Sequence, residues 1–336
     1  MIMVPANSQP KPKRSGALAL KLALVPLVLL LVLGLMLARP PSSPRALASL
    51  NEPFAAQSLD GLPTLSHYPG EDGQSLAYRH YPVSDAKGSV VLLHGSSADS
   101  RSMHTLAQAL QREGLQVDAL DLRGHGDSGP RGHIADAGQL SRDLQAFIAH
   151  TRPPQPRVLA GFSAGGGLAL RHAAHAPQGD FQGLVLLAPY IEYDAPSTRG
   201  DDSDNSDWTG ISLPRIIALN LLNAAGLSRF NDLPVLRFAL DCWGQQHLTP
   251  FYDFNLMQAM RTGPNWASDI AHLPMPVHIL VGDADGFMQA GAYPAMFATA
   301  PQGARVTPLP TLGHAELLLS PSATSATVEA VRAMIQ

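Results

Sequence analysis

The chain has 336 residues, 15% of them charged, with a formal net charge of -4. This length allows one large domain or two ordinary ones, with a substantial core. The mild negative charge, without a long basic patch, gives no signal for nucleic-acid binding, and a single cysteine, Cys242, excludes an internal disulfide.

The N-terminal segment joins a basic tail at residues 1–16 to a long apolar run. The run extends from Ala17 to Ala38, and Lys21 is its one charged residue. A helix over these residues would be about 33 Å long, enough to cross a bilayer core. We therefore predict a single-pass membrane anchor. Because basic residues precede it, we expect the rest of the chain on the non-cytoplasmic side.

The residues after the apolar run leave a second interpretation open. Residues 39–60, which begin RPPSSPRALASL, are typical of a linker, and they contain small residues suited to signal cleavage near Ala48. Cleavage there would give a secreted protein. The apolar run is longer than a typical signal core and ends well before Ala48, which favours the uncleaved anchor.

The body of the chain, residues 61–336, alternates short β-rich runs with longer amphipathic segments. The runs VVLL and LVLL are continuously apolar, as expected of strands buried on both faces. The alternation predicts an α/β domain, with a mostly parallel central sheet and helices on both faces. Strands are predicted at 75–83, 88–95, 115–122, 157–162, 183–189, 277–283 and 304–310, and helices at 103–113, 137–150, 164–176, 290–298 and 323–334.

The alternation breaks between Tyr190 and about Leu273. This segment contains the acidic loop STRGDDSDNSDW and then an apolar stretch, Leu213 to Leu227, that is predicted to be helical. It is too long for an ordinary connection. We predict an inserted helical cap over the C-terminal edge of the sheet, at about 190–273. A disordered insertion would fit the acidic loop but not the apolar helices.

One serine lies where a predicted strand meets a predicted helix. Residues 161–165 read Gly-Phe-Ser-Ala-Gly, which is the pattern G-x-S-x-G. A sharp turn there would project the Ser163 hydroxyl above the sheet, and the Ala164 N–H would point to the same place. Acyl transfer needs both a nucleophile and such a donor for the oxyanion. For this motif alone, a Gly/Ser turn without chemistry remains an alternative.

The segment His94-Gly95-Ser96-Ser97 directly follows another predicted strand. A tight turn there can present the Ser96 N–H as a second oxyanion donor, and Gly95 lets the backbone come close. A simple strand-ending turn is the alternative. We do not assign His94 as the general base, because a residue that closes a buried strand usually has a structural role.

A serine nucleophile needs a general base, and a neutral histidine needs an orienting acid. His314 follows the last predicted strand in a glycine-containing loop, and Asp285 ends the strand before it. The chain order is then Ser163, Asp285, His314. Other candidates for the acid are Asp283 and, less directly, Glu192 and Asp194.

Two further motifs have structural interpretations. Ser128 lies in GDSGP, within a loop after a predicted strand, and is expected to be a turn residue. His172 and His175 lie three residues apart on a predicted helix. Without nearby carboxylates they make a poor zinc site, so we expect helix-surface histidines and no metal.

Four segments together resemble the α/β-hydrolases, in the branch of monoacylglycerol lipases, lysophospholipase-like proteins and serine aminopeptidase-type hydrolases. They are LLHGSSADS, DLRGHGDSGPRGH, GFSAGG, and the pair VGDAD and GHAEL, and their order and spacing match from Ser89 to the C-terminus. The resemblance implies an α/β-hydrolase fold without a cofactor. It also implies site residues: Ser163 as nucleophile, Asp285 as acid, His314 as base, and the N–H groups of Ser96 and Ala164 as oxyanion hole.

These features predict a membrane-anchored serine hydrolase that cleaves carboxylic esters through an acyl-enzyme. The apolar side chains of the predicted cap favour a lipid-like ester, such as a lysophospholipid or a monoacylglycerol. An aminopeptidase or thioesterase of the same fold is an alternative. A catalytically silent binding module is another, since fold alone does not establish activity.

Overall fold

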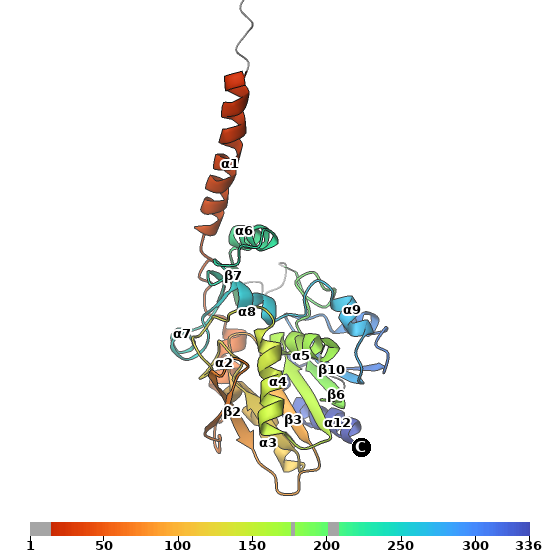
Figure 1. The fold of residues 1–336 in the computed structure, drawn as a ribbon. Helices are drawn as coiled ribbons and strands as arrows, with labels where there is room; N and C mark the ends of the chain where they lie inside the picture. Colours follow the sequence, from red (N-terminus) through yellow and green to blue (C-terminus); the bar gives the residue numbers. More distant parts are fainter. Residues whose placement is uncertain (1–14, 176–178, 201–207) are drawn as a thin grey trace, which may run out of the picture.

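The computed structural model describes residues 15–175, 179–200 and 208–336, with side chains from Val25 onward. Its centre is an eight-stranded sheet in the order β1-β2-β4-β3-β5-β6-β10-β11 (Figure 1). β2 pairs antiparallel with β1 and β4, and every pair from β4 to β11 is parallel. The strands are β1 (Leu65–Pro69), β2 (Ser75–Tyr81), β3 (Ser89–Leu93), β4 (Gln116–Leu120), β5 (Arg157–Phe162), β6 (Gly183–Leu187), β10 (Val277–Gly282) and β11 (Ala304–Leu309).

Helices cover both faces of this sheet (Figure 1). α4 (Gln139–Thr151) and α5 (Ala164–His175) pack together on one face, and α3 (His104–Arg112) and α12 (Pro321–Ile335) pack together on the other. Every residue of β3, β5, β6 and β10 is buried, which explains why these strands are mostly apolar. The predicted α/β fold with a mostly parallel sheet is therefore confirmed.

The helical segments between β10 and α12 are short. The helix predicted at 290–298 is a 3-10 turn, Ala290–Ala292, followed by α10 (Tyr293–Met296). α11 (Glu316–Leu319) follows the loop after β11 and leads into α12, whose N-cap is the Ser320 hydroxyl.

The insertion, residues 190–273, contains strands as well as helices. β7 (Thr209–Ile211), β8 (Pro234–Phe238) and β9 (Phe251–Asp253) form a small antiparallel sheet. Its helices are α6 (Leu213–Ala224), α7 (Cys242–His247), α8 (Phe254–Ala259) and α9 (Trp266–Ala271). The predicted helix from Leu213 is α6, which the Ser212 hydroxyl caps by accepting the Arg215 N–H.

The N-terminal helix α1 (Ser15–Leu37) extends away from the body, and its C-terminal end lies beside α6 (Figure 1). There Leu33 and Leu37 pack against the apolar cluster of α6, and Arg215 Nε donates to the Leu37 carbonyl at 2.8 Å. The end of the predicted anchor is thus part of the protein's own packing.

The membrane prediction is wrong for the part of the chain that is described. Among the residues whose side chains are described, 25–175, 179–200 and 208–336, no helix has the length and apolarity needed to cross a membrane. The predicted anchor over Ala17–Ala38 and the non-cytoplasmic location are contradicted. Secretion after cleavage near Ala48, which rested on the same segment, is contradicted with them.

The segment predicted as a linker, residues 39–60, forms a short helix against the body. α2 (Ala48–Ala55) is held at its start by the Leu47 N–H and the Asn51 side chain, which both donate to the Ala239 carbonyl, at 3.0 and 2.9 Å. Leu50 is buried, and the Gln57 amide donates to the Thr105 hydroxyl at 3.1 Å. This segment therefore bridges the insertion and the main domain.

Candidate active site

Ser163 lies alone between the end of β5 and the start of α5. Its φ is +51°, in the left-handed region that non-glycine residues rarely adopt, and its N–H donates to the Leu187 carbonyl at 2.9 Å. A Cβ at Gly161 would lie 2.3 Å from the Gly165 carbonyl oxygen, and one at Gly165 would lie 2.3 Å from the His94 carbonyl oxygen. Only glycine fits at these two positions, so the motif makes the strained turn possible.

Asp285 and His314 meet beyond the C-terminal ends of β10 and β11. Asp285 Oδ2 accepts a hydrogen bond from His314 Nδ1 at 2.7 Å, and the two residues are only 1% and 8% exposed. Asp285 Oδ1 accepts the N–H groups of Phe287 and Met288, at 2.8 and 3.0 Å. Burial alone would raise the pKa of Asp285, but His314 and these two N–H groups lower it below its ordinary value. The carboxylate is thus held charged, with one oxygen on the imidazole.

The other candidates for the acid have different surroundings. Asp283 is exposed and accepts the Thr311 N–H at 2.6 Å. Glu192 is buried, and its Oε1 pairs with Arg261 Nη1 at 2.5 Å. Asp194 is exposed. Of the four carboxylates, the structure brings only Asp285 to His314.

Ser163 and His314 line the same cavity, which has a volume of about 2120 Å³. The His314 ring lies between Phe162 and Phe287, with ring centroids 4.8 and 5.0 Å away. Among the described residues, no hydrogen bond joins the Ser163 hydroxyl to the free nitrogen of His314. Such bonds are often long without substrate and tighten in the reacting complex.

The loop after β3 lies directly against Ser163. A Cβ at Gly95 would be 3.2 Å from the Ser163 Cβ and 3.0 Å from the Phe162 ring, so glycine sets this close approach. Ser96 and Ala164 both line the cavity. In the described part of the chain, neither of their N–H groups donates to a backbone carbonyl. The two predicted oxyanion donors therefore border the same cavity as Ser163, with no backbone acceptor of their own among the described residues.

The walls of the cavity include the sheet edge, the insertion and α2. Much of the lining is apolar, and it includes Leu50, Phe54, Trp208, Ile216, Leu236 and Phe238. The sequence interpretation missed the contribution of α2. The signal was available, because Leu50 and Phe54 are four residues apart and so share one helix face.

Of the two helix histidines, His175 is exposed as expected, whereas His172 differs from expectation. His172 is only 2% exposed, packs edge-to-face on Phe181 and has no hydrogen-bond partner in the structure. His175 Nε2 lies 3.1 Å from Asp269 Oδ1. Within the described ranges, no group of three or more His, Cys, Asp or Glu side chains could hold a metal ion.

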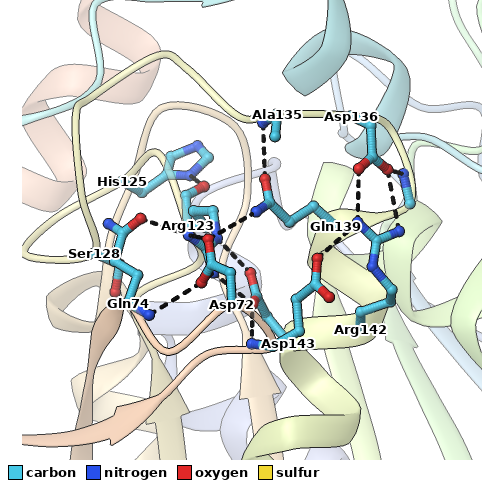
Figure 2. Close-up of polar contacts among 12 residues, drawn as sticks. Asp72, Gln74, Arg123, His125, Ser128, Ala135, Asp136, Gln139, Arg142 and Asp143 are labelled. Carbon is cyan, nitrogen blue, oxygen red and sulfur yellow. Dashed lines mark hydrogen bonds and ion pairs between the residues drawn. The ribbon is translucent and has the colours of Figure 1, made fainter.

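A polar network fixes the loop that follows β4 (Figure 2). Arg123 donates to both oxygens of Asp143 at 2.7 Å and to both oxygens of Asp72 at 2.8 and 3.1 Å. Burial opposes the charge of Arg123, but these hydrogen bonds outweigh it and raise its pKa. Ser128, in the same loop, is buried, and its hydroxyl accepts the Ala77 N–H at 2.8 Å, as a turn residue does.

Comparison with known proteins adds a family match to this geometry. The model of the family described as "Serine aminopeptidase, S33" matches residues 84–318, which is more than half of the chain. The match contains Ser163, Asp285 and His314.

Two curated relatives are lipases by name. The chain is 35% identical over 129 residues to "Monoacylglycerol lipase" of Mycolicibacterium smegmatis, a match that covers 37% of this chain and 46% of that one. It is 29% identical over 244 residues to "Monoglyceride lipase" of Rattus norvegicus, covering 68% and 76%. The chain thus spans less than half the length of the first relative.

A solved structure with a similar fold is that of a soluble variant of monoglyceride lipase from Saccharomyces cerevisiae in complex with a substrate analog. The TM-score is 0.65 at 17% identity, and the match covers 84% of this chain and 97% of the other. At this identity the likeness concerns the fold.

Proposed function

The chain belongs to the serine aminopeptidase, S33 family of α/β-hydrolases, and we propose that it is a serine hydrolase that cleaves carboxylic esters. The observation that carries the proposal is the buried Asp285–His314 hydrogen bond at 2.7 Å, on the wall of the same cavity as Ser163 in its strained turn. A nucleophile, a base and an orienting acid are the parts that acyl transfer requires.

The proposed reaction has two steps. The Ser163 hydroxyl attacks the ester carbonyl while His314 Nε2 takes its proton, and the N–H groups of Ser96 and Ala164 stabilise the negative oxygen. His314 then protonates the leaving alcohol, which leaves an acyl-enzyme. Water, activated by the same imidazole, attacks the acyl-enzyme and releases the acid. Asp285 stays charged and keeps the proton of the imidazole on Nδ1, so Nε2 is free to act.

The substrate class is proposed from the cavity and the relatives together. A volume of about 2120 Å³ with an apolar lining suits an acyl chain of medium or greater length. The two curated relatives carry the names monoacylglycerol lipase and monoglyceride lipase. We therefore propose a lipid-like ester, a monoacylglycerol or a lysophospholipid, with the insertion acting as a cap over the site.

A substrate panel tests this proposal. The purified protein is assayed on p-nitrophenyl esters from acetate to dodecanoate, on monooctanoylglycerol, on lysophosphatidylcholine and on aminoacyl amides. Each buried methylene contributes about 0.8 kcal/mol, so kcat/KM should rise severalfold per added carbon until the groove is filled. A profile that falls from acetate, or efficient cleavage of amides without lipid turnover, would contradict the lipid-ester proposal. The Ser163→Ala variant measures the background.

A further inference from the structure

The insertion holds the loop that follows β3 through one strained residue, Ser97. The φ of Ser97 is +67°, a left-handed conformation that costs free energy in a non-glycine residue. Three hydrogen bonds to the insertion keep it there. Its N–H donates to the Tyr252 hydroxyl at 2.8 Å, its hydroxyl donates to the Thr249 carbonyl at 2.7 Å, and its carbonyl accepts the Thr249 N–H at 2.9 Å.

Tyr252, on β9, is the centre of a directed chain of hydrogen bonds. A backbone N–H can only donate, so the Tyr252 oxygen accepts from Ser97 and its own proton goes to His125 Nε2, 2.7 Å away. The N–H proton of the neutral His125 ring is then on Nδ1, which donates to the Arg123 carbonyl at 3.2 Å. In this series of hydrogen bonds, each polar atom is either the donor or the acceptor of a given bond. This fixes the orientation of the phenol.

These hydrogen bonds require a neutral His125, and the surroundings of His125 keep its imidazole neutral. Burial and the neighbouring His94, whose ring centroid is 4.8 Å away, hold the pKa of His125 well below its ordinary value. His94 is neutral for the same reason, since burial lowers its pKa. Its Nε2 accepts the Leu122 N–H at 3.1 Å, and its Nδ1 donates to the Gly95 carbonyl at 2.8 Å.

This series of hydrogen bonds ends at Arg123, which is itself held in place. The Arg123 carbonyl accepts from His125, and the Arg123 side chain is clamped between Asp143 and Asp72 (Figure 2). Tyr252 is itself 1% exposed, and its ring packs edge-to-face on Phe238 with centroids 4.7 Å apart. The phenol oxygen therefore meets Ser97 from a fixed position.

We propose that Tyr252 is a positioning residue for the oxyanion hole, which fixes the Ser97 N–H and through it the direction of the Ser96 N–H. The inference rests on the proposed function, in which the Ser96 N–H is an oxyanion donor. Because peptide groups are planar, only the two backbone dihedrals of Ser96 separate its N–H from that of Ser97. The insertion thus completes the catalytic centre as well as covering it.

The test is the variant Tyr252→Phe, which removes one oxygen and keeps the ring. Loss of a whole oxyanion donor lowers kcat by about 10²–10³-fold, so a misdirected donor should lower kcat for p-nitrophenyl butanoate by about 10-fold or more. KM should stay within about 2-fold, because the lost interaction belongs to the transition state. Hydrogen exchange of the backbone amides at 94–99 should become faster.

A matched control is Tyr81→Phe. Tyr81 is also 1% exposed, and its hydroxyl also bonds to a histidine, His104 Nδ1, at 2.9 Å, but it does not line the cavity. This variant should lose stability without a change in kcat or in amide exchange at 94–99. If Tyr252→Phe melts below the assay temperature, Ser97→Ala, which removes the bond to Thr249, should show the same loss of kcat.

The outcomes separate this inference from the proposed function. Unchanged kcat together with unchanged exchange at 94–99 in Tyr252→Phe would overturn the inference. A raised KM with constant kcat would also overturn it, because Tyr252 lines the cavity and would then be a substrate contact. If the unmodified protein cleaves no ester, the proposed function fails. The exchange measurement then still decides whether Tyr252 holds the loop.

Discussion

Asp285 and Asp283 lie two residues apart in the sequence, but their carboxylates have different surroundings and hydrogen-bond partners. Asp285 faces inward, holds His314 Nδ1 at 2.7 Å and accepts two backbone N–H groups. Asp283 faces solvent and accepts the Thr311 N–H. The sequence placed both at the end of one strand, and it favoured Asp285 as the acid with Asp283 as the alternative. The backbone direction after β10, which decides between them, is a tertiary property.

We expect Asp285→Asn to lower kcat on the order of 10⁴-fold, because an amide would favour the wrong imidazole tautomer. Asp283→Asn should stay within about 3-fold of the unmodified protein, since only a surface turn loses a bond. Steady-state kinetics on one p-nitrophenyl ester compares the two. The reverse order of losses would move the acid to Asp283.

His172 illustrates a residue that the sequence could not place. Three-residue spacing from His175 on a helix suggested a surface pair, but α5 packs against both the sheet and α9, so that most of its faces are covered. His172 points into apolar packing at 2% exposure, and burial lowers its pKa to about 4. Which faces of a helix are covered depends on the elements that pack on it.

At the scale of elements, the strands of the central sheet were predictable and the insertion was less so. β3, β5, β6 and β10 are mostly apolar because helices cover both faces, and this pattern is visible in the sequence. β7 and β9 have three residues each, which is too short for a periodic signal. α2 was hidden in a segment whose prolines and serines resemble a linker.

The position of α2 gives a prediction about chain-length preference. Phe54 lines the cavity, so Phe54→Ala should remove apolar contact with a long acyl chain but not with acetate. We expect the ratio of kcat/KM for octanoate to that for acetate to fall by about 3- to 10-fold. This corresponds to the loss of contact with roughly one to two methylenes of the acyl chain. Leu227→Ala, an exposed change outside the cavity, should leave the ratio unchanged. An unchanged ratio in Phe54→Ala would mean that α2 serves packing alone.

At the scale of the whole molecule, the body folds as the sequence predicts, whereas the N-terminal region does not. The apolar composition of residues 17–38 suggested a membrane segment, but composition does not reveal that Leu33 and Leu37 pack on the cluster of α6. An apolar helix face can be buried by the protein as well as by lipid. In the fold, α6 covers the face with Leu33 and Leu37. Most of the other described apolar side chains of α1 remain exposed: Val25, Leu27, Val28, Leu29, Leu30, Leu31, Val32 and Leu35.

The stability of the molecule should depend on pH through His172. Its pKa is about 4 in the folded protein and about 6.5 when unfolded, so below pH 6.5 only the unfolded chain takes up the proton. The free energy of unfolding should therefore fall as pH drops from about 6.5 to 4, by about 2 kcal/mol at pH 5.

Urea denaturation at pH 7 and pH 5 measures this effect. The His172→Leu variant should lose about 2 kcal/mol less stability between the two pH values, because it has no proton to take up. His150→Leu, at an exposed histidine, is the control and should behave like the unmodified protein. Equal losses in His172→Leu and the unmodified protein would show that His172 is not buried in its neutral form.

The central claim is that Ser163 is the nucleophile of an ester hydrolase, and covalent labelling tests it most directly. A fluorophosphonate reacts with a serine whose hydroxyl is activated by a neighbouring base. Mass spectrometry of the treated protein should find one adduct per chain, on the peptide that contains Ser163, with hydrolysis abolished in parallel. The Ser163→Ala protein should remain unlabelled and retain its fold. An adduct on another residue, or full ester hydrolysis by Ser163→Ala, would contradict the account.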